Sequence, residues 1–97
     1  MKNYSGVRTF DGLKVTVDGK DLDPRFDLKT YSQNSFEWSF EGREPSQLAL
    51  AIIADATDDA TAKRLAEPFM RAIVANFDNE WEMSEAQVKA ALAALDT

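Results

Sequence analysis

The sequence predicts an α+β domain in which a small antiparallel sheet packs against two or three helices. In the first half of the chain, apolar and polar residues alternate with period two, as half-buried strands do. The second half contains an almost wholly apolar stretch, Leu48–Ala56, in which only Asp55 is charged. Such a stretch is typical of a helix in the middle of a domain. At 97 residues, the chain is expected to form a single domain, residues 1–97.

Three strands are expected in the first half of the chain. They are Tyr4–Phe10 as a candidate edge strand, Leu13–Val17, and Phe36–Phe40 with its three aromatic side chains on one face. Asp18-Gly19 is a turn signal suited to positive φ. Residues 26–34 show no clear pattern, and we expect them to be mostly loop.

Three helices are expected in the second half. The first begins near Pro45, because proline is tolerated in the first helical turn. The second runs from about Asp59 to Phe77 with Asp58 or Asp59 as its N-cap. The third begins at the capping box Ser84-Glu85-Ala86-Gln87.

The composition excludes several classes of site. The chain has no Cys and no His, which removes disulfides, thiolate zinc sites, Ser-His-Asp triads and imidazole switches. A metal site would need oxygen ligands alone and would suit only hard cations such as Mg²⁺ or Ca²⁺. We expect no cofactor. The net charge of −6 disfavours direct nucleic-acid binding. No apolar run reaches about 18 residues and no signal peptide is present, so we expect a cytoplasmic protein without membrane contact.

Two motifs resemble a small family of uncharacterised domains found in bacteria, archaea and phages. The first is Tyr4-Ser5-Gly6-Val7-Arg8, and the second joins Phe36-Glu37-Trp38 to Pro45-Ser46-Gln47-Leu48-Ala49-Leu50-Ala51. Leu22-Asp23-Pro24-Arg25 fits the middle of the family pattern. The resemblance covers nearly the whole chain. The family has no known activity that could be transferred to this chain. Its frequent occurrence in phages favours a protein of a mobile element.

The chain departs from this family pattern around the turn that precedes the first helix. Ser39, Phe40, Arg43 and Glu44 stand where the family resembles Gly, Tyr, Ser and Gly. A glycine-rich loop before a helix can hold an anion. Because Glu44 brings a negative charge to this turn, we do not expect phosphate to bind there.

Several motifs have both a functional and a structural interpretation. Phe36, Trp38 and Phe40 suit a ligand platform, but we expect them to pack against the Leu48–Ile53 helix. Gln47 and Glu37 suit a polar site, but a buried hydrogen bond that fixes the strand–helix corner is the expected role. The pairs Asp21/Asp23 and Asp58/Asp59 suit Mg²⁺. Turn and capping hydrogen bonds explain both pairs without a metal.

The acidic residues are unevenly distributed. Residues 1–44 carry eight acids and seven bases, whereas residues 45–97 carry nine acids and four bases. Asp78, Glu80, Glu82 and Glu85 lie within eight positions that contain no Lys or Arg, and Trp81 and Met83 are interleaved with them. If the segment is extended, the two apolar residues lie on the side opposite the acids. The segment is either a solvated loop or an acidic-aromatic docking surface for a basic partner.

Two classes of function remain open. The first is a non-enzymatic interaction protein that binds to the basic surface of a host protein or complex. In one form, this binding inhibits the partner. A phage inhibitor of a CRISPR-type complex is one concrete form. Its candidate partner-binding residues are Asp78, Glu80, Trp81, Glu82 and Glu85. If that segment is only a solvated face, Arg8, Arg25 and Tyr31 are the next candidates. The alternative class is a carboxylate-based or Mg²⁺-dependent hydrolase.

Overall fold

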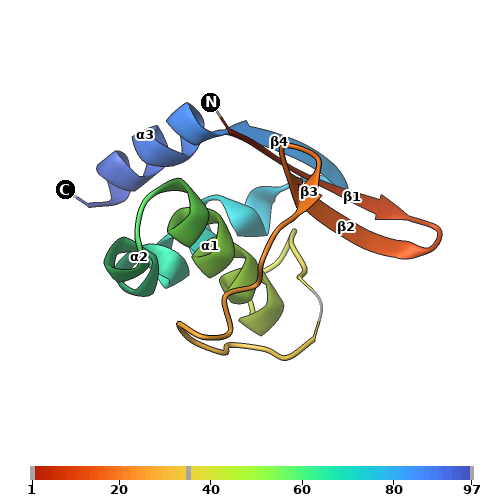
Figure 1. Cartoon of the computed structure of the whole chain (residues 1–97), viewed down its shortest axis with the longest axis horizontal. Coiled ribbons are helices and arrows are strands. Elements are labelled where there is room, and N and C mark those ends of the chain that lie inside the picture. The colour runs from red at the N-terminus through yellow and green to blue at the C-terminus, as the bar shows by residue number, and fades with distance from the viewer. Residues whose placement is uncertain (1, 35, 97) are drawn as a thin grey trace.

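A computed structural model describes residues 2–34 and 36–96. The elements of this part of the chain follow one another from the N-terminus, as Figure 1 shows. They are β1 (Asn3–Thr9), β2 (Gly12–Val17), β3 (Lys20–Asp21), α1 (Arg43–Ala56), α2 (Asp59–Ala72), the 3-10 helix η1 (Val74–Asn76), β4 (Glu80–Ser84) and α3 (Glu85–Leu95). The helices lie to one side of the sheet (Figure 1), which confirms the α+β class.

The strands form one antiparallel sheet with the order β3-β2-β1-β4. β1 is therefore an inner strand, and the prediction that it lies at the edge is wrong. The reason is β4, which comes from the second half of the chain and pairs with β1 along Asn3–Val7. The alternation of Glu80 and Glu82 with Trp81 and Met83 is the period-two pattern of that strand.

Two tight turns join the first three strands. Phe10 and Asp11 form the loop between β1 and β2, and Gly12 follows at a φ of 126°, which favours glycine. Asp18 and Gly19 join β2 to β3 with φ values of 51° and 83°. Positive φ at both loop residues is typical of a type I′ hairpin, so the Asp18-Gly19 prediction is confirmed. The β1–β2 hairpin projects beyond the helices (Figure 1).

α1 is the central helix, as its apolar composition predicts. Every residue from Pro45 to Ala54 is buried. Pro45 lies in the first turn, where its missing N–H costs no intrahelical hydrogen bond. α2 packs against α1, and its N-cap is Asp58, whose carboxylate accepts the backbone N–H of Thr61. The predicted capping box at Ser84 and Gln87 also begins α3.

α2 ends at Ala72 rather than at the predicted Phe77. The side-chain amide of Asn76 donates to the carbonyl of Ala72 at 3.0 Å. The backbone N–H of Ser39 donates to the carbonyl of Val74 at 3.1 Å. These bonds use carbonyls that a longer helix would pair with its own N–H groups. The apolar pattern thus continues past the helix because η1 also contacts the core.

The predicted strand Phe36–Phe40 is absent, and this prediction is wrong. Ser39 has a φ of 79°, which turns the chain and breaks the alternation. Trp38 is fully buried, whereas Phe40 is 46% exposed. The carbonyl of Trp38 accepts a side-chain hydrogen bond from Arg8 instead of pairing with a strand. The three aromatic residues therefore do not share one face.

The buried side chains of the sheet, the loop and the helices form one cluster. Tyr4, Trp38, Leu48, Ile52 and Phe69 are among its fully buried members. The placement of Trp38 in this core supports the structural interpretation of that residue over a ligand platform.

Trp38→Ala should lower the free energy of unfolding by ~3–5 kcal/mol, because the substitution leaves a large cavity in the core. Chemical denaturation measures the change, with the exposed Phe40→Ala as the matched control. An unaltered midpoint for Trp38→Ala would place its indole outside the core.

Candidate interaction surface

The candidate surface is built on an aromatic cluster beneath β4. Trp81 is 7% exposed, and its ring stacks on Phe77 with centroids 4.2 Å apart. Trp38 meets Trp81 edge-to-face at 5.9 Å. Among the described residues, neither indole N–H has a hydrogen-bond acceptor. Packing therefore holds this cluster together and fixes the inner face of β4.

Gly6 makes room for this cluster. It pairs with Trp81 across the β1–β4 ladder, and a Cβ atom placed on Gly6 would lie 2.3 Å from Nε1 of Trp81. Its φ is not in the left-handed region, so close approach rather than conformation requires glycine here. A larger residue at position 6 would push Trp81 away from β1.

Arg8 on β1 ties two segments that are distant in the sequence to this cluster. Its Nη2 atom donates to Oε1 of Glu37 and to the carbonyl of Trp38, each at 2.8 Å. Its Nη1 atom donates to Oδ1 of Asn79 at 2.7 Å, immediately before β4. The guanidinium also lies 4.6 Å from the centre of the Trp38 ring. Arg8 thus joins β1, the loop before α1 and the segment that enters β4.

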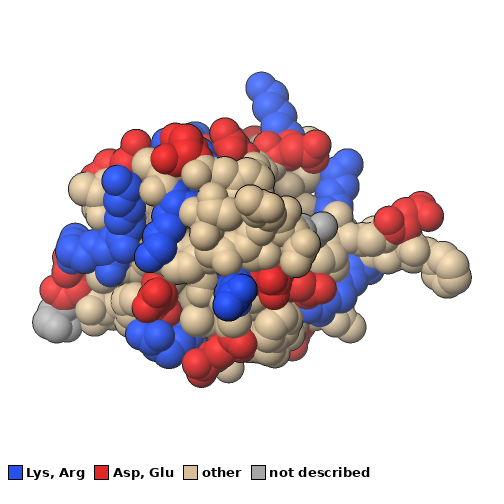
Figure 2. Space-filling model, turned by 90° about the horizontal axis from the view of Figure 1, so that it is seen from below, with Lys and Arg blue, Asp and Glu red and all other residues tan. Residues whose placement is uncertain are grey.

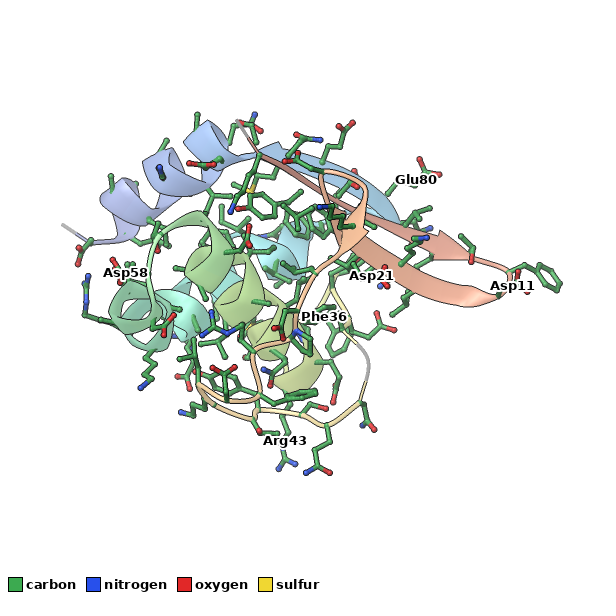
Figure 3. The ribbon with its side chains drawn as sticks, in the orientation of Figure 1. Asp11, Asp21, Phe36, Arg43, Asp58 and Glu80 are labelled. Carbon is green, nitrogen blue, oxygen red and sulfur yellow. The ribbon has the colours of Figure 1, made fainter. Side chains whose placement is uncertain are left out.

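The strand alternation places Glu80 and Glu82 on the outer face of the sheet, where both are exposed. Glu80 is labelled in Figure 3, beside β4 and away from the helices. Among the described residues, neither carboxylate has an ion-pair partner, and neither does Asp78. The amide of Asn3 donates to Oε1 of Glu82 at 2.7 Å and orients it. Together, Asp78, Glu80 and Glu82 form what we call the β4 acidic surface.

The two other predicted partner-binding residues lie elsewhere. Trp81 belongs to β4, but its side chain is buried on the inner face of the strand and packs beneath the surface. Glu85 is the first residue of α3 and forms an ion pair with Lys89 at 2.8 Å. Hydrogen bonds from the Lys89 ammonium and the Lys2 backbone N–H hold the pKa of Glu85 below its ordinary value. Its charge is already balanced, so it adds little to the β4 acidic surface.

The fallback candidates also have structural roles. Arg25 forms ion pairs with Asp27 and Asp59, and these hydrogen bonds and charges raise the pKa of its guanidinium. Tyr31 is half-buried, and Lys29 lies over its ring at 4.6 Å. Arg8 is bound within the cluster described above.

Gln47 and Glu37 are not brought together in one polar site. The buried amide of Gln47 accepts from the N–H of Tyr31 and donates to the carbonyls of Pro24 and Lys29. It therefore fastens the loop that runs over α1, while Glu37 holds Arg8. Both residues satisfy buried or half-buried polar groups, which favours their structural interpretation.

The paired carboxylates have similar explanations. Asp23 accepts the backbone N–H of Arg25, and Asp58 caps α2 with its pKa lowered by the Thr61 N–H. Within residues 2–34 and 36–96, no group of three or more acidic side chains is arranged to hold a metal ion. In the same part of the chain, no helix has the length and apolarity needed to cross a bilayer.

Sequence reasoning undervalued Arg8 and overlooked Asn3 and Asn79. The motif Tyr4-Ser5-Gly6-Val7-Arg8 contains the missing signal, because period two puts Tyr4, Gly6 and Arg8 on one face of β1. All three contact the core: the Tyr4 hydroxyl donates to Asp55 at 2.7 Å, and burial raises its pKa.

Comparison with known proteins gives a family but no activity. A family described as "Family of unknown function (DUF6166)" matches residues 4–94, and the chain therefore belongs to it. No curated protein matches the chain. No solved structure matches it either.

Gly6→Ala should lower the free energy of unfolding by about 1–3 kcal/mol, because the added methyl group collides with the Trp81 indole. Thermal or chemical unfolding measures the change. Lys20→Ala, at an exposed position of β3, is the control and should change stability by only about 0.5 kcal/mol. Equal stability of Gly6→Ala and the wild type would contradict the close packing of Trp81 on β1.

Proposed function

We propose that this protein is a small, non-enzymatic binding protein that docks its β4 acidic surface on a basic surface of a host protein or complex. One observation carries the proposal: Glu80 and Glu82 are exposed on the outer face of the sheet without a cationic partner in the described part of the chain. Unbalanced charges of this kind speed association and select a partner of opposite charge.

The position of these residues also supports docking. β4 is the last strand of the sheet order, so its outer edge pairs with no other described strand. Its inner face is fixed by Trp81 and the stacked Phe77. The two glutamates therefore project from a rigid strand, which lowers the entropic cost of presenting them to a partner.

The proposal has a finer form that concerns origin and effect. In this form the protein is encoded by a phage or another mobile element, acts in the cytoplasm and inhibits its partner. The partner handles nucleic acid, for example a CRISPR-type complex, and the acidic surface occupies a site that normally holds the phosphate backbone. The net charge of −6 supports this form.

No specific observation favours the alternative of a carboxylate-based or Mg²⁺-dependent hydrolase. Asp58 and Asp59 are engaged by capping and by the ion pair with Arg25, and Asp23 accepts a turn hydrogen bond. We therefore propose a binding role rather than catalysis.

Reversing both glutamates, Glu80→Lys with Glu82→Lys, should slow association with the partner and flatten its salt dependence, because the steering charges are removed. The partner is first captured from a host lysate and identified by mass spectrometry. Stopped-flow or surface-based kinetics at several salt concentrations then measure the association rate constant.

The control reverses two exposed glutamates on other elements, Glu41→Lys with Glu67→Lys. Both double variants change the net charge from −6 to −2, so only the location of the charge differs. The proposal expects the control to associate faster than the β4 variant. Equal association rates for the two variants would show that only the net charge matters for association. That result would contradict the role of the β4 acidic surface.

A further inference from the structure

The tip of the β1–β2 hairpin carries the most exposed large apolar side chain of the described residues. The Phe10 side chain is fully exposed and contacts no part of the core. Figure 2 shows the hairpin as an arm that projects from the body at the right of the view. A single exposed apolar residue needs no explanation by itself. A phenyl ring at the end of a projecting arm becomes informative when a matching site exists.

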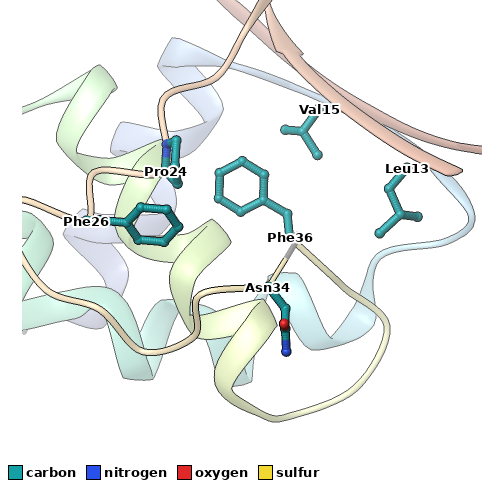
Figure 4. Close-up of a pocket in the computed structure, with 6 residues that line it drawn as sticks. All are labelled: Leu13, Val15, Pro24, Phe26, Asn34 and Phe36. Atoms are coloured by element: carbon teal, nitrogen blue, oxygen red, sulfur yellow. The ribbon is translucent and has the colours of Figure 1, made fainter.

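Such a site lies on the same chain, between β2 and the loop that leads to α1. It is an apolar hollow of about 160 Å³, lined by Leu13, Val15, Pro24, Phe26, Asn34 and Phe36. Figure 4 shows the Phe36 ring lying among Pro24, Val15 and Leu13. A cavity of about 150 Å³ with apolar walls is large enough to hold benzene. Sites for small-molecule ligands are usually larger, about 300–1,000 Å³. The hollow therefore suits one phenyl ring.

The hollow adjoins an open edge of the sheet. On the side away from β1, β2 pairs with β3 only at Thr16 and Val17, and the N–H of Leu22 donates to the carbonyl of Val15. The stretch Gly12–Lys14 has no neighbouring strand there among the described residues. A shallow groove follows this edge and shares Leu13, Val15 and Phe36 with the hollow. A second backbone can therefore approach β2 beside the hollow.

We propose that a second copy of this chain occupies the hollow, with Phe10 of each copy inserted into the hollow of the other. The tip and the hollow lie on one β-hairpin and its adjoining loop, so a two-fold arrangement uses both sites twice and closes. Asp11 beside Phe10 and Lys14 along the groove carry charges of opposite sign, and neither has an ion-pair partner among the described residues. Asp21 also borders the groove, and its negative charge repels Asp11 of the other copy.

The size of the contact predicts a weak dimer. One buried phenylalanine removes about 150–250 Å² from water, so two rings and their hollows remain below the ~1,200–2,000 Å² of stable interfaces. Each copy also carries a net charge of −6, and the two copies repel each other. Salt screens this repulsion, so added salt should strengthen self-association. Binding of the β4 acidic surface to a basic partner has the opposite salt dependence.

Sedimentation analysis from micromolar to millimolar protein tests the proposal. The wild type should dimerise with a high-micromolar dissociation constant that decreases as salt is added. Phe10→Ala should weaken the dimer at least about tenfold, because it removes the inserted side chain. Its melting temperature should not change, since Phe10 is fully exposed. Phe40→Ala, which also removes an exposed aromatic ring, is the matched control and should dimerise like the wild type.

A mixed-label NMR experiment identifies the contact directly. One copy carries labelled Leu and Val methyl groups and the other is unlabelled, so that only contacts between copies give filtered signals. Contacts from the Phe10 ring to the methyl groups of Leu13 and Val15 are the expected result. A wild type that stays monomeric at millimolar concentration would overturn the proposal. So would a dimer of equal affinity in Phe10→Ala, or a mixed-label spectrum of the dimer without contacts from Phe10 to the methyl groups of Leu13 and Val15.

Discussion

The guanidinium of Arg8 is the interaction on which the arrangement of the sheet and the loop depends. It donates to the side chain of Glu37, the carbonyl of Trp38 and the side chain of Asn79, three groups that lie far from β1 in the sequence. Its central carbon also lies over the Trp38 ring, 4.6 Å from the ring centre. An arginine keeps its charge at any ordinary pH and offers several donors in one plane, which few other side chains can replace. Arg8 thus fixes to β1 both the end of the loop that precedes α1 and the segment that enters β4.

This constraint separates the two faces of β4. Gly6 leaves room for Trp81 on the inner face, and Trp38 and Phe77 complete the packing around it. The period of two then directs Glu80 and Glu82 outward, where the sheet has no helical layer (Figure 3). The acidic surface is therefore a consequence of how the aromatic residues pack. The opposite edge of the sheet adjoins an apolar hollow, and the exposed Phe10 lies at the tip of the β1–β2 hairpin.

The sequence predicted the elements whose local signals agree with their tertiary environment. The apolar α1, the Asp58 cap, the Asp18-Gly19 turn and the Ser84 capping box are of this kind. Phe36–Phe40 has the alternation of a strand, but tertiary hydrogen bonds from Arg8 and the positive φ of Ser39 decide its conformation. β4 was missed as a strand because its pairing with β1 spans more than 70 residues. The glutamates of the candidate surface were predicted, but the burial of Trp81 and the Lys89 partner of Glu85 depend on contacts that local patterns do not encode.

Amide hydrogen exchange in Arg8→Met tests most directly whether Arg8 holds β4 in place. Methionine keeps an unbranched side chain but removes the guanidinium donors to Glu37, Trp38 and Asn79. We expect the β4 amides paired with β1 to exchange at least about tenfold faster, while the amides of α1 keep their protection. Unchanged exchange in β4, or an equal acceleration throughout the chain, would contradict a specific role of Arg8 in positioning the acidic strand.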